Sequence, residues 1–319
     1  MRRFRPLFAC SAAILLAALL ACAPQFPARA QDTDTGAIRV NSNLVMLDAT
    51  VKTKSGDIMA NLKKDDFEVR EDGVKQKIEV FSRDELPLNI ALVLDLSDSI
   101  EPFLAPLRDA ATTVLETLKP DDEAALFTFS TDAQLLVPLT QDKSAIAQQI
   151  GTLKTGGTTN INDGIFAAAQ NFLTTAPKGR RVIILISDDV GTDPGTEGTR
   201  DIVTESIAAD TSVYNLKIPG YNPPPPPGFF RDTRGIVDIG QVTSETGGEI
   251  FNVPEVAQLS SVFAALIERI RTRYALGYYT SATGAMGKPH KLDVRLAPSF
   301  GTKGRDYVML SKTSYYIGP

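Results

Sequence analysis

The sequence predicts an α/β protein whose doubly wound, mostly parallel sheet is inserted in a small β-sandwich-like domain formed by the two ends of the chain. Two observations carry this prediction. In the middle of the chain, short apolar runs alternate with segments of helical periodicity. Before residue 87 and after residue 274, the apolar residues instead recur at every second position, as they do in half-buried strands.

The middle of the chain alternates between buried-strand and helix patterns. Residues 90–94 and 182–186 are continuously apolar, as expected for strands buried on both faces of a parallel sheet. Helical spacing follows in residues 103–118, 161–173 and 257–274. Such alternation indicates right-handed crossovers within one sheet. Further expected elements are strands at 125–129, 135–139 and 212–216 and helices at 202–209 and 237–246.

The flanking segments are expected to form one β-rich unit. Residues 44–53 alternate strictly, and Asp72-Gly73 is a hairpin-turn signal between two further strand patterns. Either segment alone has too few strands to be stable, so we expect 36–86 to pair with 275–319. Two separate appendages are the alternative. The expected strands of the second segment are residues 274–279, 291–296 and 307–310.

The first thirty residues have the pattern of an export signal. Three arginines precede an apolar run at residues 7–22, and Ala28-Arg29-Ala30 offers a cleavage site, so residues 1–30 read as a signal peptide. The run is too short for a comfortable membrane span. Residues 19–22 also resemble a lipoprotein signal, in which 1–21 is removed and Cys22 carries a lipid anchor. Either route predicts a secreted, periplasmic or lipid-anchored protein without an integral membrane span after processing.

Composition excludes several kinds of protein. Both cysteines, Cys10 and Cys22, lie in the signal segment, so no disulfide is expected in the folded part. That segment holds four of the 33 basic residues and no acid, which leaves 29 basic and 38 acidic residues, a formal charge of −9. A chain this acidic has little tendency to bind nucleic acid.

Hard oxygen ligands follow the predicted core strands. Asp95, Ser97 and Ser99 come directly after the first apolar run, and Asp188 follows the run at 182–186. Residues 155–161, with the sequence TGGTTNI, form a glycine-hinged loop before a helix. Each segment alone has a simpler interpretation, such as a helix N-cap. Together they lie at the carboxyl edge of the predicted sheet, where open α/β sheets bind ligands, and Mg²⁺ prefers such oxygens.

These three segments resemble the metal-ion-dependent adhesion site of von Willebrand factor A (VWFA) domains, which have a Rossmann-like fold. The resemblance covers residues 87–274. It implies a divalent ion, Mg²⁺ before Mn²⁺ or Ca²⁺, with Thr158 as the alternative threonine and with Asp189 where the family usually has glycine. The implied metal ligands are Asp95, Ser97, Ser99, Thr159 and Asp188.

The flanks resemble a narrower group of exported bacterial VWFA-related proteins that has no well-defined activity. The matching segments are residues 62–73, Thr246-Gly247-Gly248, residues 274–278 and residues 314–317. This closer resemblance refines the expected architecture more than the expected function.

The resemblance implies a protein-binding or adhesion module in which a partner's Asp or Glu side chain completes the metal coordination. The alternatives are a metal-independent scaffold of a cell-envelope complex and a metal-dependent hydrolase with Asp188 or Asp189 as base. We expect no enzyme, because the sequence has no nucleophile elbow and no phosphate-binding loop, and His290 is its only histidine. Five prolines at residues 223–227 predict a stiff polyproline II loop.

Overall fold

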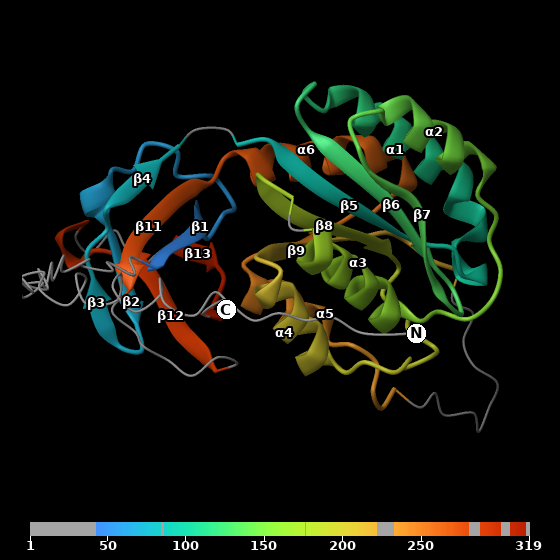
Figure 1. Cartoon of the computed structure of the whole chain (residues 1–319). Helices are drawn as coiled ribbons and strands as arrows, with labels where there is room; N and C mark the ends of the chain where they lie inside the picture. Colours follow the sequence, from blue (N-terminus) through green and yellow to red (C-terminus); the bar gives the residue numbers. More distant parts are fainter. Residues whose placement is uncertain are drawn as a thin grey trace, which may run out of the picture. The chain divides into compact units, whose positions relative to one another are not determined.

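The central sheet has six strands in the order β10-β9-β8-β5-β6-β7, and every neighbouring pair is parallel except β6 and β7 (Figure 1). In this computed structural model the described residues are 43–83, 86–175, 177–221, 233–280, 288–300 and 307–316. The six strands are β5 (Leu88–Asp95), β6 (Glu123–Phe129), β7 (Ala133–Thr140), β8 (Arg180–Ser187), β9 (Thr211–Lys217) and β10 (Ile250–Asn252).

Helices cover both faces of this sheet and enclose two separate apolar cores. Alternate residues of β5 point to opposite faces, so Leu92 packs with one core and Val93 with the other. On the first face lie α1 (Leu104–Thr117), α2 (Lys143–Thr152) and α6 (Leu259–Arg271). On the second face lie α3 (Ile161–Thr175), α4 (Thr199–Ala208) and α5 (Ile239–Thr246). Short 3-10 turns are η1 (Lys64–Asp66), η2 (Asp98–Phe103), η3 (Val256–Gln258) and η4 (Pro298–Phe300).

The two ends of the described chain pair with each other in two four-stranded antiparallel sheets, ordered β13-β1-β11-β4 and β14-β12-β2-β3. Val45 lies opposite Tyr278, and Val69 lies opposite Val294, and all four side chains join a third apolar core. The predicted fold class is therefore confirmed, whereas the exact domain boundaries stay a prediction. The strands are β1 (Asn43–Thr53), β2 (Phe67–Glu71), β3 (Val74–Gln76), β4 (Val80–Ser82), β11 (Tyr274–Thr280), β12 (Pro289–Leu296), β13 (Tyr307–Ser311) and β14 (Ser314–Tyr316).

Three details differ from the sequence-based expectation. Helix α2 was not expected, because it buries only Ile146 and Ile150 and so has a weak apolar pattern; its start is fixed by Asp142, which accepts a hydrogen bond from the Ala145 amide at 3.1 Å. The expected helix at 257–274 was too long, because Tyr274 already belongs to β11. Strand β10 was also missed, since three residues are too few for a period to show.

The predicted hairpin at Asp72-Gly73 is confirmed. Asp72 has φ 47° and Gly73 has φ 85°, so both central residues take the left-handed conformation that a tight two-residue hairpin requires. Several predictions lie outside the described residues, namely the signal segment with Cys10 and Cys22 and the proline run at 223–227. Among the described helices, none has the length and apolar character needed to cross a membrane.

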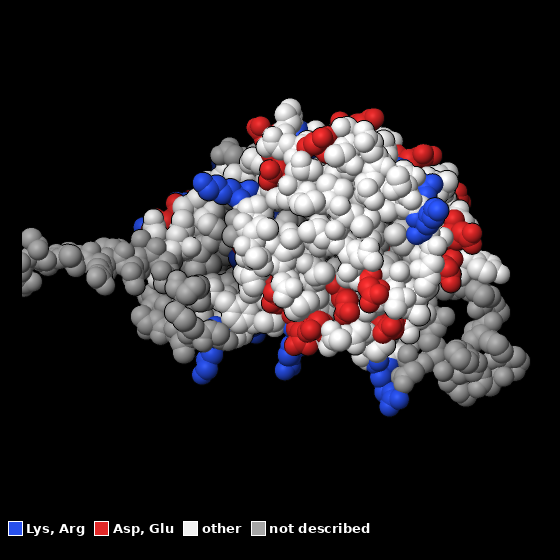
Figure 2. Space-filling model, turned by 45° about the vertical axis from the view of Figure 1, so that its right-hand side comes forward, with Lys and Arg blue, Asp and Glu red and all other residues white. Residues whose placement is uncertain are grey.

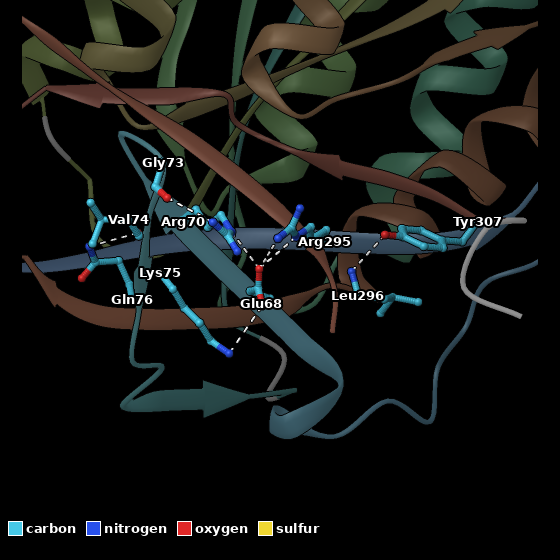
Figure 3. A network of polar contacts seen from close by, with 9 residues as sticks. All are labelled: Glu68, Arg70, Gly73, Val74, Lys75, Gln76, Arg295, Leu296 and Tyr307. Atoms are coloured by element: carbon cyan, nitrogen blue, oxygen red, sulfur yellow. Dashed lines mark hydrogen bonds and ion pairs between the residues drawn. The ribbon is translucent and has the colours of Figure 1, made fainter. Parts of the chain in front are cut away.

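A buried carboxylate anchors the second sheet of the β unit. Glu68 on β2 accepts hydrogen bonds from Arg70 Nε at 2.8 Å and from Arg295 Nε at 3.0 Å, and Lys75 Nζ lies 3.4 Å away (Figure 3). The hydrogen bonds from Arg295 and then Arg70 lower the pKa of Glu68 to about 2. Arg295 comes from β12, so this carboxylate links the beginning of the chain to its end.

Protonation of Glu68 should weaken the fold in acid. Its folded-state pKa is near 2 and its ordinary value is 4.5, so its contribution to stability is complete above about pH 4.5 and is lost as the pH falls toward about 2. We expect Glu68→Gln to lower the free energy of unfolding at pH 7 and to approach wild-type stability near pH 2. Denaturant unfolding at several pH values measures this. Glu79→Gln, which breaks only an exposed pair with Lys77, should change little; equal losses in both variants would contradict the assignment.

Candidate functional site

The first loop of the site leaves the carboxyl end of β5 with its polar side chains already buried. Asp95 is 0% exposed and Ser97 is 1% exposed. The Ser97 amide donates a hydrogen bond to Asp95 Oδ1 at 2.9 Å, which closes a tight turn around the carboxylate. The hydroxyl oxygens of Ser97 and Ser99 lie 3.2 Å apart. Local hydrogen bonding within five residues thus gathers one carboxylate and two hydroxyl groups.

Ser187 joins this loop to the neighbouring strand. Leu94 lies opposite Ile186 in the β5–β8 pairing, so Asp95 and Ser187 leave the sheet together. The Ser187 hydroxyl donates to Asp95 Oδ2 at 2.6 Å and accepts from the Asp189 amide at 3.1 Å. Sequence reasoning gave Ser187 no role, although it stands directly before the predicted Asp188. Its position at the end of a parallel neighbour of β5 was the signal that would have found it.

Asp188 lies beside the same edge and is 4% exposed. Its Oδ1 accepts a hydrogen bond from the Val190 amide at 3.0 Å, so the loop after β8 turns around this carboxylate as the first loop turns around Asp95. Gly220 follows β9 and passes so close that a Cβ there would lie 1.9 Å from Asp188 Oδ2. The backbone at position 220 therefore requires glycine for its close approach, which sequence reasoning also missed.

Burial and a neighbouring carboxylate raise the cost of ionising Asp95. Burial is the main reason that the pKa of Asp95 rises to about 6, and the negative charge of Asp188 adds to it. Hydrogen bonds from Ser187 and Ser97 oppose the shift by stabilising the ionised form. Within the described part of the chain, no group of three or more His, Cys, Asp or Glu side chains could hold a metal ion.

The glycine-threonine loop, residues 155–161, is hydrogen-bonded to the loop after β5 and to the segment after β8. The Gly156 amide donates to Leu96 O at 2.8 Å, and the Thr159 amide donates to Thr192 Oγ1 at 2.8 Å. Thr159 is 3% exposed, whereas Thr158 is exposed and bonds Thr131 Oγ1 at 3.2 Å. The structure thus brings the three predicted segments to one edge of the sheet and gives its two threonines different environments.

Asp189 takes the backbone conformation that a glycine would take. Its φ is 63°, in the left-handed region that non-glycine residues rarely adopt. Asn215 Nδ2 donates to both of its carboxylate oxygens at 2.9 Å, and Lys217 Nζ lies 3.4 Å away. Burial raises the pKa of Asp189, while Asn215 and Lys217 lower it in part. The unusual aspartate therefore keeps the shape of the loop and directs its charge toward β9.

In the face drawn in Figure 2, acidic side chains gather in the lower part and along the upper and right margins, and basic side chains are more scattered. This distribution agrees with the excess of acidic residues in the sequence. A surface of this kind repels acidic partners unless a cation offsets its charge.

Comparison with known protein families identifies the central domain. Residues 90–191 match the von Willebrand factor type A domain. The chain contains a von Willebrand A domain. The match spans all three loops of the candidate site, from β5 to just beyond β8, and it agrees with the expectation that the protein is not an enzyme.

Solved structures with similar folds come from different kinds of protein, as three of them show. An aerotolerance-related membrane protein from Bacteroides fragilis is 20% identical over 57% of this chain and 98% of its own, with a TM-score of 0.44. A von Willebrand factor type A protein from Catenulispora acidiphila is 12% identical over 86% and 75%, with a TM-score of 0.46. Proximal thread matrix protein 1 from mussel byssus, with a zinc-occupied adhesion-site motif, is 17% identical over 63% and 49%, with a TM-score of 0.47. A search of curated protein sequences found no match.

Removing the Ser187 hydroxyl should destabilise the A domain. Ser187→Ala leaves the buried Asp95 carboxylate without one of its donors, and we expect a loss of about 1–3 kcal/mol in the free energy of unfolding, measured with denaturant. Ser206→Ala is a matched control, because the Ser206 hydroxyl is equally buried but has no hydrogen-bond partner among the described residues. It should cost less than about 1 kcal/mol or be neutral. An equal loss of unfolding free energy in both variants would show that the hydrogen bond from Ser187 to Asp95 adds no stability beyond that of any buried serine.

Proposed function

We propose that the protein is an exported interaction module whose A domain binds a partner carboxylate through a divalent metal ion. The observation that carries this proposal is the set of hard oxygen atoms at one edge of the sheet, where the buried loop of Asp95 lies beside Asp188. The residues that would hold the ion are Asp95, Ser97, Ser99, Thr159 and Asp188, with Thr158 and Asp189 as neighbouring candidates.

The donor set fits a small divalent cation. Two oxygens bound to the same Mg²⁺ at right angles lie about 3 Å apart, because each Mg–O distance is about 2.1 Å. The 3.2 Å between the hydroxyl oxygens of Ser97 and Ser99 is close to that spacing before any ligand is added. The two carboxylates match the formal charge of a divalent ion, and the hydroxyl ligands are neutral, so they add no further negative charge that would repel a partner's carboxylate. Mg²⁺ is the preferred ion, and Mn²⁺ and Ca²⁺ are alternatives with the same oxygen chemistry.

The chain's own residues prepare the site for a partner. Ser187 fixes one oxygen of Asp95 and the Ser97 amide fixes the other, so the carboxylate is oriented without a ligand. Asp189 is held away by Asn215 and Lys217, which limits the negative charge at the site. A divalent ion there supplies positive charge and an exchangeable coordination position. An Asp or Glu side chain of a partner protein is the ligand that such a position favours.

The remaining parts of the proposal follow from the sequence. The basic and apolar pattern of residues 1–30 supports an extracytoplasmic location, either as a secreted or periplasmic protein or through a lipid anchor at Cys22. The excess of acidic residues supports a protein partner rather than nucleic acid.

Metal titration tests the site directly. We expect calorimetry to detect binding of Mg²⁺ or Mn²⁺ to the wild-type protein, and Asp95→Ala and Ser97→Ala to weaken that binding by about tenfold or more. Asp98→Ala is the matched control, because Asp98 is an exposed acid of the same loop that stands outside the ligand pattern. Absence of binding by the wild type, or equal weakening by Asp98→Ala, would favour the metal-independent scaffold.

Partner chemistry is tested with short immobilised peptides that carry Glu or Asp at one position. We expect capture of the protein in Mg²⁺, loss of capture in excess EDTA, and loss of capture when the acidic residue of the peptide is replaced by Gln or Asn. Capture that is equal with and without chelator would contradict the metal bridge. Metal-dependent cleavage of a peptide or phosphoester, abolished by Asp95→Ala, would instead support the hydrolase alternative.

A further inference from the structure

A cavity lined partly by charged residues lies at the opposite end of the A-domain strands from Asp95. Its volume is about 180 Å³, and it is lined by the beginnings of β8 and β9 together with residues of β1 and β11. Both regions belong to one compact unit, residues 42–319. The charged residues that line the cavity are Asp48, Arg180, Arg181, Asp210, Arg273 and Lys312. Four bases and two acids leave an excess of positive charge in an otherwise acidic protein.

Two of the four bases are already paired. Arg180 Nε donates to Asp48 Oδ2 at 2.7 Å and its Nη2 donates to Asp48 Oδ1 at 3.2 Å, a two-point contact that neutralises both groups. Lys312 Nζ lies 2.6 Å from Asp210 Oδ1. The excess charge therefore belongs to the other two bases, Arg181 and Arg273.

Arg273 is a buried cation without a carboxylate partner among the described residues. It is 2% exposed, and it donates to Ser212 Oγ at 3.0 Å and to Gly247 O at 2.9 Å. Its Nε has no hydrogen-bond partner in the described part of the chain. The ring of Tyr214, 6.0 Å from the guanidinium carbon, and the carboxyl end of α5 offset the charge only in part. Buried charges are normally paired, so this one indicates a missing anion.

Donors remain available around the cavity. Ser212 accepts from Arg273, so its own hydroxyl proton points elsewhere, and the described residues show no hydrogen bond donated by this hydroxyl. Arg181 uses Nε on Pro177 O and Nη1 on Ala209 O, which leaves Nη2. Lys312 has two further N–H bonds beyond its contact with Asp210. Arg273 polarises the Ser212 hydroxyl, which makes it a stronger donor.

The positive charges of these bases shift the pKa of Asp210. Desolvation raises the pKa of this carboxyl, yet the charges of Lys312, Arg181 and Arg273 outweigh it, and the pKa is lowered overall. The Asp210 carboxyl therefore ionises more readily beside these bases, chiefly through its direct contact with Lys312.

We propose that this cavity binds a small tetrahedral oxyanion, inorganic phosphate or a group of the same chemistry. The anion would accept hydrogen bonds from the Ser212 hydroxyl, Lys312 and Arg181, with Arg273 behind Ser212. One water molecule occupies about 30 Å³ in the liquid, so the cavity has room for five heavy atoms. The site uses none of the residues proposed to hold the metal, and it stands independently of that proposal.

Calorimetric titration with inorganic phosphate tests the site, with EDTA present so that no metal contributes to anion binding. We expect saturable binding to the wild-type protein and weakening by about tenfold in Ser212→Ala and in Lys312→Gln, each of which removes one donor. Phosphate should also raise the unfolding temperature of the wild type more than that of either variant, because a ligand of the folded state stabilises it.

Two matched controls separate the site from general electrostatics. Ser244→Ala removes an exposed serine hydroxyl on α5, and Lys64→Gln removes an exposed positive charge in η1. Both should bind phosphate as the wild type does. The proposal is overturned if the wild type shows no saturable binding, if Lys64→Gln weakens binding as much as Lys312→Gln, or if acetate binds as tightly as phosphate.

Discussion

The hydrogen bond from Ser187 to Asp95 couples the two central strands of the A domain at the edge where the candidate site lies. A buried carboxylate is costly to desolvate, and this one is tolerated because a hydroxyl and an amide satisfy its two oxygens. The same hydroxyl accepts from the Asp189 amide, so it also positions the loop that carries Asp188. The first and third loops therefore cannot shift independently, and the geometry of the site depends on the parallel pairing of β5 with β8.

The β-rich unit has a similar dependence on one carboxylate. Glu68 receives arginines from β2 and β12, strands separated by the whole A domain in sequence. Antiparallel pairing of β1 with β11 and of β2 with β12 means that neither end of the described chain can form its sheets alone. Folding of this unit thus requires the long insertion to bring its ends together, which costs loop-closure entropy that a compact A domain reduces.

Sequence patterns predicted those features that depend on neighbouring residues. The buried strands, the Asp72-Gly73 hairpin and the turn at Asp95 each depend on interactions between residues a few positions apart. The sequence predicted each of them, and the structure contains them. Ser187, Gly220 and Asn215 were missed because their roles arise from contacts between loops that only the sheet order brings together. Helix α2 was missed for a different reason, since it packs lightly and its cap at Asp142 carries no apolar signal. The left-handed backbone of Asp189 contradicts the usual preference of its residue type, and only Asn215 and Lys217 explain how it is held.

The insertion of the A domain has a mechanical consequence. The chain enters the domain at Leu88, the first residue of β5, and returns through α6 to Tyr274 at the start of β11. Arg180, at the beginning of β8, donates to Ile270 O near the end of α6, so both connections lie at the edge of the sheet opposite Asp95. A tensile load applied at the Asp95 edge would run along the parallel strands and divide between two covalent attachments. Because Asp95 ends β5 and Leu88 begins it, that load reaches the first attachment along a single covalent strand, and no pair of strands has to slide for the force to be transmitted.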